Sequence, residues 1–179
     1  CIMEPERIEH LIAIATNAQA SPWGIAFREA QRMALEADSS FRIKSLSAGQ
    51  KGMKAARAIA LLSYRNYNAY RQSQSEETNE LTDNFRASSY QNYQGDKLVT
   101  RFNAHVYWYL SKAMDTNNAG RGRKSVTEAL ATIKAKTLAI AIATDILFPP
   151  NEQQFLAEHI PDAVFKEINS LYGHDLSLI

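Results

Sequence analysis

The chain has 179 residues, of which 45% are hydrophobic and 22% are charged, a composition typical of a folded globular domain. Its 20 Lys and Arg residues against 19 Asp and Glu leave a net charge of +1, which argues against a surface dedicated to nucleic acid. The single cysteine, Cys1, excludes an internal disulfide framework and a cysteine-based zinc cluster. No apolar run approaches the roughly 20 residues that cross a bilayer. We therefore expect a soluble, cytoplasmic protein that binds neither a membrane nor a metal.

The first half of the chain predicts one strand followed by helices. Leu11 to Ala15 is a short apolar run, typical of a strand buried on both faces of a parallel sheet. A helix is predicted over Ser21 to Ala37, since it begins with a capping serine and a proline at the first helical position. Apolar spacing predicts further helices after Gly52 and from Ala104 to Met114. The polar segment from Arg71 to Asp96 is interpreted as a loop.

The second half returns to strands. Thr137 to Ala143 is a second apolar run of the doubly buried type, a helix is predicted from Pro149 to His159, and Ala163 to Ile168 is a third strand. Strands that alternate with helices indicate an α/β fold with a mostly parallel sheet. We expect three segments: a core strand in residues 1–20, a helical insertion in 21–132, and the remaining core strands and helix in 133–179.

Two polar residues follow predicted strands, where ligands bind in open α/β sheets. Asp145 follows the second strand and His174 follows the third. An acid followed by a histidine is the order of the last two members of a Ser-Asp-His triad in α/β hydrolases, where the carboxylate orients the imidazole. The alternative is that Asp145 only caps a turn and that His174 is an ordinary loop residue.

The nucleophile of such a triad is not evident. A nucleophile elbow needs Gly-x-Ser-x-Gly between a strand and a helix, and the chain has no such pattern. Ser47 precedes Ala48 and Gly49 but lacks the strand and the first glycine. The chain also begins on Cys1 without a methionine. We therefore expect that the nucleophile of a hydrolase-fold protein would lie upstream of Cys1.

Several short segments, in order along nearly the whole chain, resemble the homoserine O-acetyltransferase family. The segments are Glu4-Pro5-Glu6-Arg7-Ile8, Ile12 to Ala18, Trp23 to Phe27, Gln31-Arg32, Gly52-Met53, Ser63-Tyr64-Arg65, Asp145 to Pro149 and Tyr172-Gly173-His174-Asp175. The resemblance implies the C-terminal part of an α/β-hydrolase fold with a helical lid. It places the serine, its elbow and the oxyanion donors before Cys1.

The resemblance also implies a reaction. A serine would take an acetyl group from acetyl-CoA and pass it to the hydroxyl of L-homoserine, a step of methionine biosynthesis. His174 would be the base in each half-reaction and Asp145 would orient it. Acetyl-CoA would be a co-substrate, and no bound cofactor is expected. The tyrosines of the helical stretch suggest lid packing and a homodimer interface.

Three further residues match substrate-binding positions of the family. Arg65 would hold the homoserine carboxylate through two charge-assisted hydrogen bonds, and Asp175 would bind the ammonium group. Tyr107 matches a lid tyrosine near the same pocket. Without the resemblance, Arg65 is a solvated cation at a helix end and Asp175 is a turn residue. For Tyr107, packing in the core is an equal alternative to the place near the pocket.

Other functions remain open. The acyl group could be succinyl, the acceptor could be serine, or water could replace the acceptor, as in an esterase of the same fold. An esterase has no need of a clamp for both charged ends of an amino acid. A third reading is a dimerisation module without activity. We expect the 179 residues alone to lack transferase activity and to expose an apolar sheet edge.

Overall fold

The structure is a computed structural model that describes residues 1–178, and its contacts divide the chain into two units. The sheet unit comprises residues 1–21 and the residues from Thr116 onward, and the helical unit comprises Pro22–Asp115. The helical unit ends earlier than the insertion expected to reach residue 132. The reason is that Ala119 and Leu130 pack with the core of the sheet unit.

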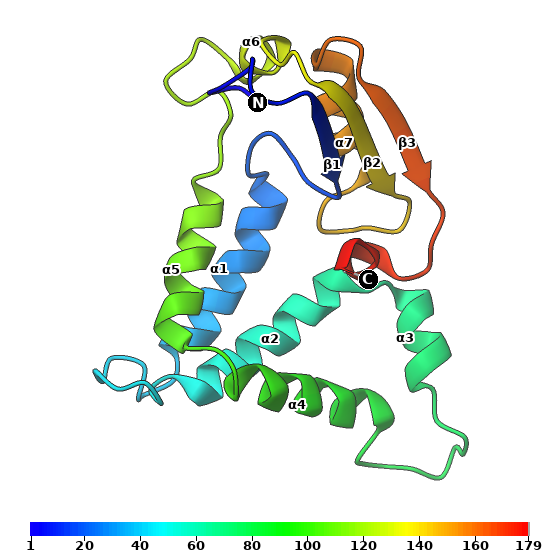
Figure 1. Ribbon diagram of the computed structural model, residues 1–179. Coiled ribbons are helices and arrows are strands. Elements are labelled where there is room, and N and C mark those ends of the chain that lie inside the picture. Colours follow the sequence, from blue (N-terminus) through cyan, green and yellow to red (C-terminus); the bar gives the residue numbers. More distant parts are fainter. Residues whose placement is uncertain (179) are drawn as a thin grey trace. The chain divides into compact units, whose positions relative to one another are not determined.

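The sheet unit contains a parallel sheet, as predicted. Its strands are β1 (His10–Ile14), β2 (Lys136–Ile142) and β3 (Val164–Ile168), in the order β1-β2-β3 with β2 in the centre (Figure 1). In its described part this unit also has two α-helices, α6 (Val126–Ala131) and α7 (Pro150–His159). The three strands and α7 match the predicted elements closely. The α/β class is confirmed.

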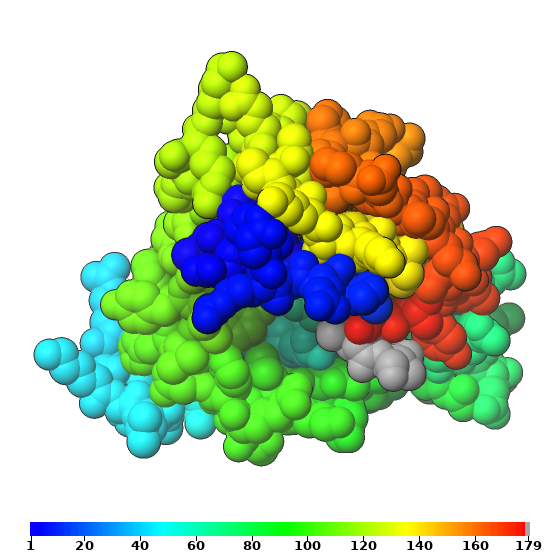
Figure 2. Space-filling view, turned by 45° about the horizontal axis from the view of Figure 1, so that its top comes forward, coloured from blue at the N-terminus to red at the C-terminus, as the bar shows by residue number. Residues whose placement is uncertain are grey.

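Small side chains on the central strand let helices approach one face of the sheet. Ala139 is fully buried and joins Leu130, Ile133, Leu156 and Ile160 in one core cluster. Burial of these aliphatic side chains is the main stabilising contribution within the unit. The N-terminal segment covers part of the same cluster. Figure 2 shows this segment against the residues that lead into β2, where Glu6 pairs with Lys134.

The opposite face of the sheet is exposed, which corrects one prediction. Ile12 and Ile14 of β1 are 63% and 44% exposed, although both were expected to be buried. Side chains alternate along a strand, so Leu11 and Ala13 face the core cluster while Ile12 and Ile14 point to the other face. Val164 of β3 is also exposed. The strand positions are right, and the burial expected on both faces of β1 is wrong.

The helical unit contains five helices in the part of the chain that the structure describes. They are α1 (Pro22–Glu36), α2 (Gln50–Tyr64), α3 (Tyr67–Gln74), α4 (Arg86–Val99) and α5 (Ala104–Asp115). Helices α1, α2 and α5 were predicted. No helix among residues 1–178 combines the length and the apolar character needed to span a bilayer.

Helices α3 and α4 overturn the predicted loop between Arg71 and Asp96. Helix α4 carries few apolar residues, and only Gly95 and Leu98 are buried along it. Gly95 lies so close to α2 that a Cβ atom there would be 2.5 Å from Lys54 Cγ. Helix α4 is therefore stabilised by close packing on α2, which a hydrophobic pattern does not reveal.

A buried ion-pair network joins α1 to α5. Arg28 Nε and Arg32 Nη2 both contact the carboxylate of Asp115, and Arg32 Nη1 donates to Ser111 Oγ at 3.1 Å. The Arg32 side chain is only 2% exposed. Removal of one member of such a buried network would leave an uncompensated charge and would destabilise the packing of α1 on α5.

The start of α2 depends on a carboxylate that is distant in sequence. Gly49, which precedes the helix, has φ +72° and offers no side-chain cap. Asp38 Oδ2 instead accepts a hydrogen bond from Gly52 N at 3.0 Å, and its Oδ1 accepts from Ser40 N and Ser40 Oγ. The hydrogen bond from Gly52 N, followed by those from Ser40, lowers the pKa of Asp38 to about 2.

Replacing Asp38 tests this contribution to stability through its pH dependence. The lowered pKa means that the stabilisation is complete above the unfolded value of 3.8 and is lost as the pH falls toward about 2. Asp38→Asn should therefore lower Tm by a constant amount from about pH 7 to pH 5, and the difference from wild type should narrow below about pH 4. Thermal melts followed by circular dichroism measure the Tm of variant and wild type at each pH. Asp96→Asn, which removes one member of an exposed ion pair, is the control.

If the Tm difference between Asp38→Asn and wild type stays the same below about pH 3, the ionised Asp38 carboxylate does not stabilise the start of α2.

Candidate active site

Asp145 lies three residues beyond β2, in a turn that its own side chain organises. Oδ1 accepts hydrogen bonds from Leu147 N at 2.8 Å and Phe148 N at 2.9 Å, and the side chain is fully buried. Oδ2 lies 2.8 Å from His174 Nδ1. The two readings of Asp145 from the sequence are therefore compatible, because one carboxylate oxygen caps the turn and the other contacts the histidine.

His174 lies in η1 (Gly173–Leu178), a short 3-10 helix that follows β3 after a loop. Its side chain is 15% exposed, and its ring lies 5.2 Å from that of Phe148 at an angle of 33°. Ser177 Oγ donates to His174 O at 2.7 Å. A carboxylate only accepts hydrogen bonds, so His174 Nδ1 bears the hydrogen that it donates to Asp145 Oδ2. The ring lone pair of this neutral tautomer therefore lies on Nε2.

This pair of side chains has the arrangement of a general base with its orienting acid. A buried carboxylate fixes the tautomer of the imidazole and stabilises the imidazolium that forms when Nε2 takes a proton. The backbone donors on Oδ1 hold the carboxylate itself in place. The pair can remove a proton from a hydroxyl group and later return it to a leaving group.

The other predicted site residues are distributed over the two units. Asp175 follows His174 directly in η1 of the sheet unit. Arg65 belongs to the helical unit, where it follows α2 in an extended conformation with its Cζ 4.9 Å from the centre of the Tyr90 ring. Their roles at the two ends of a substrate stay predictions.

Tyr107 of α5 has a packing role in the helical unit. Its hydroxyl donates to Gln31 Oε1 at 2.6 Å, and its ring packs edge-on against Phe102. Burial raises the pKa of the Tyr107 hydroxyl, so the group stays protonated and acts as a hydrogen-bond donor. A contact with substrate stays a prediction for this residue.

Sequence reasoning gave no role to three residues that shape the surroundings of His174. Phe148 packs against its ring, Gly173 precedes it with φ +59°, and Thr144 contacts the loop before it. Two signals were available in the sequence, since Thr144 and Gly173 each directly precede one of the two candidate residues. A glycine next to a candidate base indicates a special backbone conformation.

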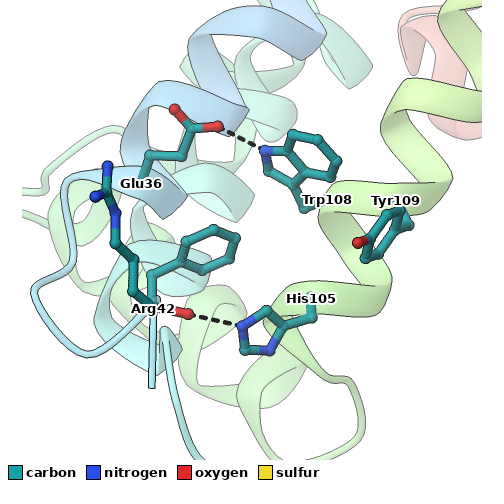
Figure 3. A pocket seen from close by; sticks show the side chains of 6 residues that line it. Glu36, Arg42, His105, Trp108 and Tyr109 are labelled. Carbon is teal, nitrogen blue, oxygen red and sulfur yellow. Dashed lines mark hydrogen bonds between the residues drawn. The ribbon is translucent and has the colours of Figure 1, made fainter. Parts of the chain in front are cut away.

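The helical unit contains a cavity of about 320 Å³ between the first half of α5 and the end of α1 with the residues that follow it (Figure 3). Trp108 Nε1 donates to Glu36 Oε1 at 2.7 Å, and His105 Nε2 lies 2.7 Å from Phe41 O. These polar groups of the wall therefore bind one another. Within residues 1–178, no three His, Cys, Asp or Glu side chains are grouped so as to hold a metal ion.

Comparison with known proteins identifies close relatives. The homoserine O-acetyltransferase of Cyclobacterium marinum is 51% identical over 97% of this chain and 49% of its own length. That of Thermus thermophilus is 38% identical over 99% of this chain and 45% of its own length. No family model matches. The chain spans about half the length of the curated relatives it matches.

Solved structures show the same fold. The homoserine O-acetyltransferase of Bacillus anthracis superposes with a TM-score of 0.85 at 18% identity, over 97% of this chain and 50% of that one. An acetylester hydrolase from Corynebacterium glutamicum superposes with a TM-score of 0.80 at 19% identity. The match covers 97% of this chain and 50% of that one. The chain therefore has the fold of the α/β hydrolases and is a homologue of the homoserine O-acetyltransferases, about half of whose length it spans.

Proposed function

We propose that the full-length protein containing this chain transfers an acetyl group from acetyl-CoA to the side-chain hydroxyl of L-homoserine. The observation that carries the proposal is the contact of His174 Nδ1 with the buried carboxylate of Asp145 at the carboxyl ends of β2 and β3. Homology to homoserine O-acetyltransferases over nearly the whole chain supports the substrate pair.

The proposed reaction runs in two half-reactions with one covalent intermediate. A serine from the remainder of the full-length protein attacks the thioester carbonyl, while His174 Nε2 takes its proton and passes it to the departing CoA sulfur. The homoserine hydroxyl then attacks the acyl-serine ester. His174 takes the hydroxyl proton and returns it to the serine, so that the enzyme is restored and O-acetylhomoserine leaves.

The chain also carries groups suited to an amino-acid acceptor. A guanidinium binds a carboxylate through two parallel charge-assisted hydrogen bonds, and a carboxylate binds an ammonium group. In the proposal, Arg65 takes the first role and Asp175 the second, which favours a zwitterion over a simple alcohol. The similarity of their sequence surroundings to the family supports this assignment.

The main alternative is an esterase in which water accepts the acyl group. It is favoured by the structural likeness to an acetylester hydrolase at a TM-score of 0.80.

The two functions differ in their products, because the transferase forms O-acetylhomoserine and the esterase forms acetate. Mass spectrometry of reactions with acetyl-CoA or succinyl-CoA, and with homoserine or serine, identifies donor and acceptor together. Acetate as the main product in the presence of homoserine would contradict the transferase.

Replacing Arg65 tests the acceptor site in the full-length protein. Arg65→Ala should raise KM for homoserine by about 10- to 100-fold, because a charge-assisted pair is lost, and should leave the release of CoA in the first half-reaction nearly unchanged. Stopped-flow detection of CoA and steady-state assays separate the two effects. Arg71→Ala, at an exposed arginine of α3, is the matched control. An equal loss in both half-reactions would show that Arg65 does not bind the acceptor.

We further propose that the protein forms a homodimer through the helical unit. Helix α5 carries a stripe of exposed apolar side chains, namely Val106, Tyr109, Leu110 and Met114. Their spacing of three and four residues places them on one side of the helix, and large exposed apolar patches mark interaction surfaces. Sedimentation equilibrium should find a dimer that Leu110→Glu dissociates. A wild-type protein that is monomeric at all concentrations refutes this part of the proposal.

The proposed location is the cytoplasm, where the reaction would serve methionine biosynthesis. The support is the homology to amino-acid biosynthetic enzymes. Fractionation of cells that express the full-length protein tests the location, and recovery in the membrane fraction would refute it.

A further inference from the structure

Thr144 joins the end of the central strand to the loop that carries His174. Its Oγ1 donates a hydrogen bond to Ser170 O at 2.6 Å and accepts one from Gly173 N at 3.1 Å. Ser170 and Gly173 lie on either side of Leu171 and Tyr172, which are both exposed. One hydroxyl group therefore closes the base of this loop, directly before His174.

We infer that Thr144 is a positioning residue for the reaction, which holds His174 at the distance from Asp145 that base catalysis requires. The inference rests on the proposed function and assigns Thr144 no contact with substrate. Thr144 and Asp145 are neighbours in the chain, and so are Gly173 and His174. The hydroxyl bond between Thr144 and Gly173 thus runs beside the bond between Asp145 and His174 and ties the same two segments together.

The backbone of the loop explains why a side-chain hydroxyl is needed here. Parallel pairing of β2 with β3 ends at Ile142 and Ile168, and Ala143 N still donates to Ile168 O at 3.0 Å. Beyond that point Gly173 turns with φ +59°, so the regular ladder cannot continue to the histidine. A hydroxyl both donates and accepts, and Thr144 can therefore bind a carbonyl and an amide of the loop at the same time.

Loss of the hydroxyl should affect the rate more than substrate binding. Valine has the shape of threonine but cannot form either hydrogen bond, so Ser170 O and Gly173 N would need other partners and the loop would shift. A shift of about 1 Å in a catalytic group can lower the rate by roughly 100-fold. KM should change little, because Thr144 is assigned no part in holding either substrate.

The test compares Thr144→Val and Thr144→Ser with wild type in the full-length protein. Thr144→Val should lower kcat by about 10- to 100-fold with less than about 3-fold change in either KM, and Thr144→Ser should restore most of the rate. The proton of His174 Nδ1, seen as a downfield NMR signal, should weaken in the valine variant and return in the serine variant. This signal reports the contact with Asp145 directly and requires no turnover.

Thr137→Val is the matched control. Thr137 is a buried threonine near the start of β2, at the end of the strand opposite to Thr144. Its hydroxyl donates to Ala135 O at 2.9 Å. This variant should lose stability without losing kcat or the downfield signal. If Thr144→Val does not fold, Thr144→Ala takes its place, with the same expected loss and the same rescue by serine.

The outcomes separate this inference from the proposed function. If wild type makes no O-acetylhomoserine but the downfield signal still depends on the Thr144 hydroxyl, the proposed function fails and the positioning role stands. If Thr144→Val keeps both its kcat and its signal, the positioning role is refuted. The same conclusion follows if Thr137→Val reduces kcat and signal equally, because the effect would then be one of general stability.

Discussion

The geometry of the candidate site depends on one buried carboxylate. Asp145 is fully buried, and its two oxygens accept from Leu147 N, Phe148 N and His174 Nδ1. A buried charge is tolerated only when hydrogen bonds replace the water it has lost. The Asp145 carboxylate therefore depends on hydrogen bonds from its own turn and from His174. If either segment moved away, a buried charge would lose hydrogen bonds and the folded state would be destabilised. This requirement couples the fold of the sheet unit to the chemistry proposed for it.

The parallel sheet supplies the rest of the arrangement. Because β2 and β3 run in the same direction, their carboxyl ends lie at the same edge, and residues that are 29 positions apart come into contact there. Helix α7 connects the two strands and packs on the face of β2 that carries Ala139. This packing holds the ends of the two strands at a fixed spacing. A rigid sheet is a suitable support for a base, since catalytic groups lose efficiency with small displacements.

Much of the sheet unit could be predicted from the sequence, for identifiable reasons. The apolar runs near Leu11, Thr137 and Ala163 are bounded by polar or turn residues, and all three are strands in the structure. Asp145 and His174 were found because they follow two of these strands. The burial of the strands was less predictable. A run of apolar residues such as Ile12 to Ile14 predicts a buried strand, but it does not show which face of the sheet the helices cover.

The helical unit was predicted only in part, because α1, α2 and α5 follow apolar or capping patterns whereas α3 and α4 do not. Helix α4 is polar, and it packs closely on α2 because Gly95 has no side chain at the contact. Helix α2 is capped by Asp38, which lies 14 residues before Gly52 in the chain. Helix α6 of the sheet unit was not predicted either, although Ser125 and Glu128 at its start form a capping signal in the sequence. Thr144 shows a further limit, because its importance lies in two hydrogen bonds to backbone atoms of a distant loop.

In the proposed reaction His174, oriented by Asp145, is the base in both halves of an acyl transfer. The most direct measurement is rapid-quench kinetics of His174→Asn in the full-length protein, with CoA release and O-acetylhomoserine formation followed separately. Both rates should fall by a similar factor, about 1,000-fold or more. If the variant retains either half-reaction at close to the wild-type rate, His174 is not the base of that half-reaction.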